Sequence, residues 1–337
     1  MANRAEWIDL LDPDEAELDK AIPDEVHDRA LALLLEPATH DDEPRPRIEG
    51  HETYVFGIFL VPICVREEDR VFYQEVDVVA TSDRFVTVRK TPENGHPFDV
   101  SGVVEAWHAG GEMSVGEITY LFLDQIAEDY LNLVDAIDDE IDELEDGIEE
   151  WSAQQIRDRI STLRHDLLHV RRALAPIRDA IHRVVDRRVE VGRGAEIFPP
   201  EIERSFGDVY DRLLRAVDGL DFSRDLLASA RDYHQAKIGN DQNEAMKTLT
   251  VIASVLLLPT FIVGLYGQNF HHIPELGWSF GYWWSWGWIV VTTAIQLWFF
   301  RRKGWINVPG FRRPRLKPLR TLDPRKLAGR RRHSHVR

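Results

Sequence analysis

The sequence has a single cysteine, and it lacks both a secretory signal and a P-loop. A single cysteine, Cys64, excludes an internal disulfide framework and favours a reducing compartment. Residues 1–25 contain no apolar run of the kind that forms a secretory signal, so we expect the N-terminus to stay in the cytoplasm. No Gly-x-x-x-x-Gly-Lys-Ser/Thr loop occurs, which argues against an ATP-driven engine of the P-loop class.

Basic residues are missing from a long part of this acidic chain. The formal net charge is −17, and no Lys or Arg occurs between Lys90 and Arg157. Asp and Glu crowd the second half of that interval, and such a surface repels nucleic acid and attracts cations. The tail 301–337 has the opposite character, with 14 Lys and Arg and a lone acid, Asp323. Divalent cations are therefore expected partners, and nucleic acid is not.

Charge is almost absent from residues 248–300, where Glu275 is the only formally charged residue. Residues 248–267 and 280–300 are apolar, and each approaches the roughly 20 residues that a helix needs to cross a bilayer. We expect two membrane-spanning helices joined by an external loop, 268–279. Because cytoplasmic flanks retain Lys and Arg, the basic tail predicts that both termini are cytoplasmic and that the chain lies in the plasma (inner) membrane.

Helix and strand signals alternate in residues 1–115 and predict a cytoplasmic α/β domain. Asp12 is a candidate N-cap, with Pro13 at the first helical position and Glu15 at the reciprocal capping position, so a helix is expected over 13–21. Strands are expected in segments rich in Val, Ile, Phe and Tyr: 53–64, 71–81 and 85–89.

Helical periodicity dominates the chain after this domain. Apolar residues return every three or four positions from Leu121 to Ile148, with acids between them, which predicts an acidic helical hairpin over 116–198. Beyond Pro200 no proline occurs until Pro259, so a single helix is expected from about residue 201 to 267.

This long helix would contain a stalk, 199–247, that continues directly into the first span. At about 1.5 Å per residue it would be roughly 100 Å long, far longer than a bilayer is thick. The expected fold class is therefore an α+β membrane protein. A cytoplasmic α/β domain with a helical hairpin would be connected by the stalk to two C-terminal transmembrane helices.

Small polar and apolar residues share one face of the predicted stalk and first span. They are Asp232, Asn243, Met246, Leu249, Thr250, Ser254, Leu257 and Thr260. Their spacing of mostly three or four residues is compatible with packing between membrane helices and with the lining of a pore. One helix cannot enclose a pore, so the second interpretation requires an oligomer.

The sequence around the predicted loop resembles a known family. Tyr266-Gly267-Gln268-Asn269-Phe270 is followed by Ile273-Pro274-Glu275-Leu276, Trp278 and Gly281-Tyr282. This arrangement resembles the CorA family of divalent metal ion (magnesium) transporters, whose signature is Y-G-M-N-F followed by an M-P-E-L loop. The likeness extends upstream to three further segments: Asp139–Asp142, Phe206–Asp211 and Asn243–Lys247.

The resemblance implies a homopentamer shaped as a funnel, with stalk helices that form the pore. It places Asn269 in an outer selectivity ring, where its amide could hydrogen-bond a hydrated ion, and Gly267 where backbone freedom is needed. Gln268 replaces the family's Met, either altering selectivity or substituting for Met in packing. The remaining implied pore positions are Thr260 and Ser254 as polar sites, Leu257, Leu249 and Met246 as hydrophobic constrictions, and Asn243 and Asp232 toward the cytoplasmic mouth. Glu275 would attract cations outside, or be a solvated loop acid.

The resemblance also implies control by Mg²⁺ bound between neighbouring cytoplasmic domains. Asp208 matches the stalk position of that site. On the α/β domain, His96 stands at the family's acidic position and Asp99 lies nearby, so the site is expected to be altered or weaker. A histidine would shift the preference from Mg²⁺ toward transition metals.

These features favour a passive influx channel for Mg²⁺, with Co²⁺ and Ni²⁺ as further candidates. The alternatives are a proton-coupled Zn²⁺ transporter of the same superfamily and a membrane-anchored sensor that does not conduct. We expect no enzymatic activity: His165 and His169 have the spacing of a zinc protease helix, but Asp166 stands where that chemistry needs Glu.

Overall fold

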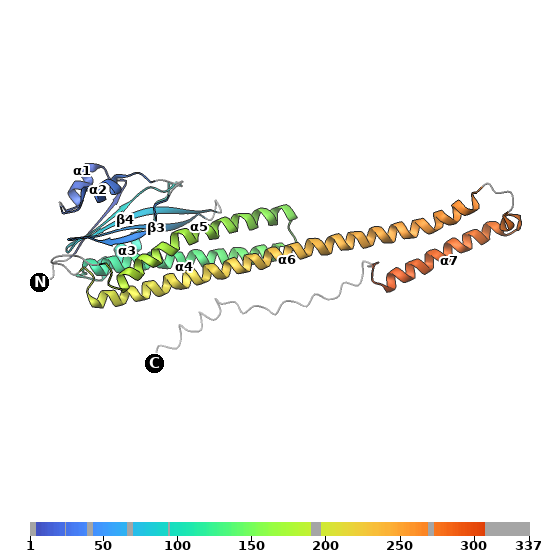
Figure 1. Ribbon diagram of the computed structural model, residues 1–337. Helices are drawn as coiled ribbons and strands as arrows, with labels where there is room; N and C mark the ends of the chain where they lie inside the picture. Colours follow the sequence, from blue (N-terminus) through green and yellow to red (C-terminus); the bar gives the residue numbers. More distant parts are fainter. Residues whose placement is uncertain are drawn as a thin grey trace, which may run out of the picture. The chain divides into compact units, whose positions relative to one another are not determined.

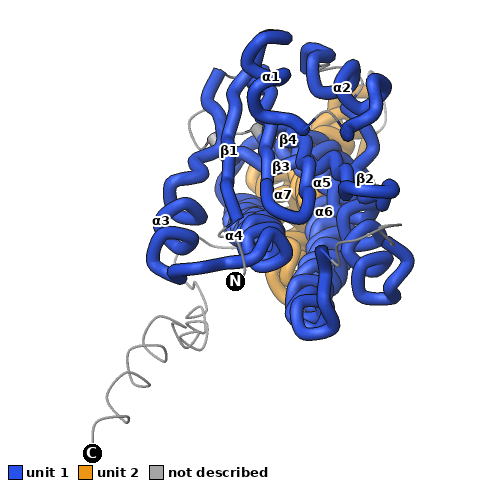
Figure 2. The backbone as a smooth tube through the Cα atoms, turned by 90° about the vertical axis from the view of Figure 1, so that its left-hand side faces the viewer, with its two compact units in different colours: residues 1–235 blue, residues 236–337 orange. Residues whose placement is uncertain are grey.

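The computed structural model describes residues 5–23, 25–38, 43–65, 70–93, 95–189, 197–268 and 273–306. The chain divides into two compact units, Met1–Gln235 and Ala236–Arg337, which have different colours in Figure 2. The first unit contains a sheet covered by helices, and the second contains the apolar C-terminal helices. Each unit is described by itself.

The sheet of the first unit has five strands in the order β1-β5-β4-β3-β2. Their bounds are Glu6–Leu11 for β1, Arg47–Gly50 for β2, Val55–Val65 for β3, Arg70–Ala80 for β4 and Arg84–Arg89 for β5. β1 pairs with β5 in parallel, and the other neighbours are antiparallel. The three predicted strands are confirmed as β3, β4 and β5. The edge strands β1 and β2 were not predicted: acids interrupt the apolar residues of β1, and β2 has four residues, of which only Ile48 is a large apolar one.

Helices α1 (Glu15–Ala21) and α2 (Asp28–Leu35) cover one face of the sheet (Figures 1 and 2). Their apolar residues pack on Phe56, Ile58 and Val86. The predicted cap is wrong: the N-cap is Asp14, which accepts from the Glu17 N–H at 2.8 Å in a reciprocal capping box. Asp12 instead has φ 46° at the end of β1, and its carboxylate accepts from the Thr91 N–H at 2.9 Å.

Helices α3 (Ser101–Ala109), α4 (Val115–Gly147) and α5 (Ala153–Val185) belong to the second hydrophobic cluster, with residues from the opposite face of the sheet. Capping boxes begin both long helices, Ser114 with Glu117 and Ser152 with Gln155. The Tyr130 hydroxyl is fully buried and donates to the Leu60 carbonyl at 2.8 Å, which ties α4 to the centre of β3.

Helix α6 (Pro200–Tyr266) is one uninterrupted helix of 67 residues, with Pro259 inside it. The prediction of a single helix over about 201–267 is confirmed. Its first part packs closely on α4, where a Cβ added to Gly219 would lie 2.9 Å from the Val134 side chain. Polar contacts join the same two helices: Arg212 lies 2.5 Å from Asp124, and Ser223 Oγ donates to Asp138 at 2.5 Å. Just beyond the end of α4, Glu149 accepts from the Tyr233 hydroxyl of α6 at 2.7 Å.

The second unit contains the last part of α6, the short 3-10 helix η1 (Pro274–Gly277) and helix α7 (Gly281–Arg302). Among the described residues, one helix, α6, is both long and apolar enough by mean hydropathy to span a membrane. Helix α7 has 22 residues and is rich in Trp, which hydropathy indices score as weakly polar although it is common at membrane interfaces. The second span therefore stays a prediction.

Candidate ion pathway and cytoplasmic control site

Large apolar side chains of the predicted pore face are exposed on the single chain. The exposed fractions are 62% for Met246, 61% for Leu249 and 71% for Leu257. The rest of the chain buries only 6% of the most apolar 18-residue stretch of α6. Such a surface must be covered by lipid or by other copies of the chain, because its exposure to water is costly.

Hydroxyl groups on this part of α6 donate to their own helix. Thr260 Oγ1 donates to the Leu256 carbonyl at 2.7 Å, and Thr250 Oγ1 donates to the Met246 carbonyl at 2.8 Å. A hydroxyl that has used its hydrogen in this way still offers oxygen lone pairs. Thr260 can therefore present an acceptor to a cation or to the water molecules around it.

A hydrogen bond joins α7 to α6 near the proline of the first span. Gln296 Nε2 donates to the Ser254 carbonyl at 3.1 Å. Pro259 has no N–H to donate to the carbonyl of Val255, the next residue along α6. The contact thus lies where the ladder of helix hydrogen bonds is interrupted. Ser254 is half-buried at this point.

The first two residues of the predicted filter, Gly267 and Gln268, directly follow the end of α6. Gly267 donates its N–H to the Val263 carbonyl at 2.9 Å and does not have a positive φ, so the expected special backbone conformation is not found there. A side chain would still be crowded, because an added Cβ would lie 3.2 Å from the Val263 oxygen. Gln268 is exposed, and Asn269 lies outside the described residues.

Glu275 of the predicted external loop and the two polar residues predicted for the cytoplasmic mouth, Asn243 and Asp232, have different environments. Glu275 lies in the first turn of η1 and is half-buried. Asn243 is exposed on α6, and the exposed carboxylate of Asp232 lies 3.1 Å from Arg231. Asp232 belongs to the first unit and Asn243 to the second.

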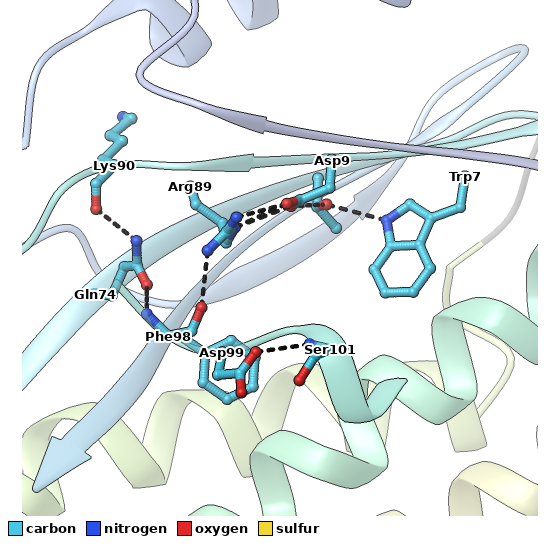
Figure 3. A network of polar contacts seen from close by, with 9 residues as sticks. Trp7, Asp9, Gln74, Arg89, Lys90, Phe98, Asp99 and Ser101 are labelled. Carbon is cyan, nitrogen blue, oxygen red and sulfur yellow. Dashed lines mark hydrogen bonds and ion pairs between the residues drawn. The ribbon is translucent and has the colours of Figure 1, made fainter. Parts of the chain in front are cut away.

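The three predicted control residues are all exposed on the first unit. Asp208 is on α6, whereas His96 and Asp99 precede α3. Asp99 Oδ1 accepts from the Ser101 N–H at 2.9 Å, and hydrogen bonds from the Ser101 backbone and side chain lower the pKa of Asp99 (Figure 3). Asp99 is therefore an anion near pH 7.

Buried side chains fix the loop that carries Asp99. The Phe98 N–H donates to Gln74 Oε1 at 2.6 Å, and the Phe98 carbonyl accepts from Arg89 Nη1 at 2.8 Å (Figure 3). Gln74 is fully buried and also donates to the Lys90 carbonyl at 2.9 Å, while Arg89 pairs with Asp9 at 2.6 Å. Sequence analysis missed these positioning residues. A glutamine within a strand of Val, Phe and Tyr was the only signal for Gln74.

Among the described residues, no group of three or more His, Cys, Asp or Glu side chains is already arranged to hold a metal ion. The single chain thus does not assemble Asp208, His96 and Asp99 into a closed site. The predicted site between neighbouring chains stays a prediction.

Comparisons with known proteins identify the family. Residues 3–302 match the family described as CorA-like Mg²⁺ transporter protein. The putative metal ion transporter YfjQ of Bacillus subtilis is 28% identical over 308 residues, which cover 90% of each chain. The cobalt/magnesium transport protein CorA of Thermotoga maritima is 28% identical over 78% of this chain and 73% of its own.

Solved structures show the same fold. The complete CorA magnesium transporter of Methanocaldococcus jannaschii aligns with a TM-score of 0.70 at 24% identity, over 90% of this chain and 92% of its own. The full-length CmaX protein aligns with a TM-score of 0.65 at 21% identity, over 90% of each chain. The α+β fold class is confirmed. The chain belongs to the CorA-like Mg²⁺ transporter family, whose members are divalent cation transporters and not enzymes.

Proposed function

We propose that this protein is a passive influx channel for divalent cations, with Mg²⁺ as the main ion and Co²⁺ and Ni²⁺ as further substrates. Five copies would form the channel in the plasma (inner) membrane, with both termini in the cytoplasm. The observation that carries the proposal is helix α6, which runs without a break from the sheet-containing unit into the apolar unit and leaves its periodic face uncovered.

The membrane potential supplies enough energy for this transport. Moving one charge through 100 mV is worth about 2.3 kcal/mol, so an entering divalent cation gains roughly 4.6 kcal/mol. No P-loop is present to supply energy from ATP.

Weak contacts with a hydrated ion suit conduction. Mg²⁺ loses water reluctantly, and neutral amide oxygens of Asn269 can hydrogen-bond its water shell without removing it. Thr260 and Ser254 would offer further oxygens along the path. Rings of Leu257, Leu249 and Met246 would exclude water in the closed state, and a modest rotation of α6 would rehydrate the path.

Intracellular Mg²⁺ would close the channel by bridging neighbouring chains. Asp208 of one chain and Asp99 of the next would supply oxygen ligands, which Mg²⁺ prefers. The loop of Asp99 is held by Gln74 and Arg89, so the carboxylate is positioned before the ion binds. His96 at this site would increase its affinity for transition metals.

A proton-coupled Zn²⁺ transporter is the second candidate. It is favoured by the zinc transport protein ZntB of Yersinia pseudotuberculosis, which is 24% identical over 70% of this chain and 67% of its own. The Ile273–Leu276 loop, which resembles the M-P-E-L loop of the magnesium transporters, favours the first candidate.

Ion flux into liposomes that contain the purified protein distinguishes the two candidates. We expect Mg²⁺ influx that follows an inside-negative potential, and we expect Asn269→Ala to abolish it while assembly is preserved. Asn132→Ala, on the exposed surface of α4, is the matched control and should leave influx unchanged. Zn²⁺ entry driven by a proton gradient would support the second candidate. No flux of any ion from an assembled oligomer would instead indicate a sensor.

A further inference from the structure

Two histidines that are not part of the predicted control site project side by side from α5. His165 and His169 are four residues apart, so they share one face of the helix, and their ring centroids are 5.7 Å apart. His169 also makes an edge contact with the Tyr73 ring, at 5.2 Å between centroids, which orients its imidazole. A His pair at this spacing on one helix face can chelate a single metal ion.

A carboxylate from a distant part of the chain approaches the same pair. Glu43 Oε2 lies 3.6 Å from His169 Nε2. Around a tetrahedral Zn²⁺ with metal–ligand distances near 2.1 Å, two ligand atoms are separated by roughly 3.4 Å. These two groups therefore need little movement to share one ion.

The groups border an open cleft of about 630 Å³ between α5 and the sheet, which contributes the first half of β4 and Leu60 of β3. Its lining includes Glu43, Tyr73, His165, Asp166 and His169. The side chain of His165 is 78% exposed, so it can rotate toward an ion in the cleft without disturbing the core.

The side chains of this cleft have the chemistry of a metal ligand set. Imidazole nitrogens and a carboxylate oxygen are all ligands that Zn²⁺ accepts in proteins. A bound cation would be shared by Glu43, His165 and His169.

We propose that Glu43, His165 and His169 form a binding site for a transition-metal dication of the Zn²⁺ class on the sheet-containing unit. The site closes when His165 rotates inward, since no three-ligand group is preformed among the described residues. Two imidazoles make it selective for Zn²⁺, Co²⁺ or Ni²⁺ over Mg²⁺. The bound ion would connect α5 to the segment that leads into β2. This proposal does not depend on the direction or identity of the transported ion.

Cobalt is the probe for the test, because tetrahedral Co²⁺ bound to nitrogen ligands absorbs strongly in visible light. The detergent-solubilised full chain would be stripped of metal and titrated with Co²⁺ in excess Mg²⁺, which occupies sites built from oxygen. We expect the spectrum of tetrahedral Co²⁺. In His165→Gln the apparent affinity for Co²⁺ should fall about 100-fold, because even the loss of a group that only orients a metal ligand lowers metal affinity about 10–100-fold.

Two further variants separate the site from other histidines. Glu43→Gln preserves shape and should also weaken the signal. His182→Gln is the matched control, because His182 is on the same helix and lies 3.3 Å from the acid Asp186, four residues on. Unchanged spectra and stoichiometry in both His165→Gln and Glu43→Gln would overturn the proposal, as would an equal loss in His182→Gln. Because the His165 side chain is exposed, its replacement should not disturb the fold, and a loss of Co²⁺ binding in His165→Gln would not be explained by misfolding.

Discussion

At the scale of single residues, the sheet contains two buried carboxylates that share one ammonium group. Lys90 Nζ lies 2.5 Å from Glu75 and 3.3 Å from Asp77, and it also donates to the Leu33 carbonyl at 3.0 Å. Burial is the main cause that raises the pKa of Asp77 from 3.8 to about 7, and Glu75 adds to the effect while Lys90 opposes it. The folded chain therefore binds this proton more tightly than the unfolded chain does.

The sign of the pH dependence follows from that difference. Because the folded pKa of Asp77 is raised, its ionisation lowers the free energy of unfolding as the pH rises from about 4 to about 7. We expect Asp77→Asn to gain stability relative to the natural chain by up to about 3 kcal/mol between pH 5 and pH 8, since roughly two pKa units of the shift lie in that interval.

Urea unfolding of the solubilised full chain, followed by tryptophan fluorescence at the two pH values, measures this change. Asp19→Asn, at an exposed position on α1, is the control and should show no such gain. A gain for Asp77→Asn that is the same at both pH values would mean that burial of its charge is not the cause.

The control site gives a second prediction at this scale. If Asp208 binds the regulatory ion, Asp208→Ala should leave flux less inhibited by internal Mg²⁺, with the half-inhibitory concentration raised by at least about 10-fold, because an oxygen ligand is lost. Flux from liposomes loaded with graded Mg²⁺ measures this. Asp218→Ala, at another exposed position on α6, is the matched control. Unaltered inhibition in Asp208→Ala would locate sensing elsewhere.

At the scale of elements, the turn between η1 and α7 requires a glycine. A Cβ added to Gly281 would lie 2.3 Å from the Glu275 carbonyl oxygen, so the backbone of the loop acid would have to move. We expect Gly281→Ala to destabilise the loop by roughly 1–3 kcal/mol, as overpacking does, and to reduce influx. Gly287→Ala on the same helix is the control, because no atom lies within 4 Å of its added Cβ.

The test is to measure Mg²⁺ influx and the rate of heat inactivation for both variants, and we expect only Gly281→Ala to differ from the natural chain. Equal behaviour of Gly281→Ala and Gly287→Ala would show that the close approach to Glu275 does not matter for the loop.

Some acids of helix α4 face solvent, and others bind side chains of α6. Two of its acids do not simply attract cations: Asp124 and Asp138 bind Arg212 and Ser223 of α6. Glu149, just beyond the end of α4, likewise binds Tyr233 of α6. A displacement of the stalk part of α6 must therefore either move α4 with it or break these bonds.

At the scale of the whole molecule, one chain is too little to form the proposed channel. A single α6 cannot enclose a path, and few residues of its apolar stretch are buried by the rest of the chain. We expect the protein in lipid nanodiscs to have a protein mass five times that of one 39.0 kDa chain. Native mass spectrometry would measure the number of chains in each assembly. A cross-linked sample is the control, because its subunits cannot dissociate during the measurement. A conducting monomer or dimer would contradict the proposed path.

Local patterns predicted much of this molecule. Periodicity alone indicated α6 as one helix, because apolar spacing and the lack of proline are properties of neighbouring residues. The Tyr266–Phe270 signature pointed to the family, which the comparisons confirmed. The absence of charge in 248–267 pointed to a membrane segment, and α6 has the length and mean hydropathy that such a span needs. Three interior strands followed from their Val, Ile and Phe content.

Contacts between distant residues were beyond such patterns. Asp12 and Asp14 were both chemically suited to cap α1; Asp14 is the cap, whereas Asp12 binds Thr91, 79 positions away in the chain. The hydrogen bond between Phe98 and Gln74 and the approach of Glu43 to His169 are likewise contacts between residues that are far apart in the sequence. Composition and spacing reveal which side chains are available. Packing of the sheet against its helices decides which of them meet, because that depends on the path of the whole chain.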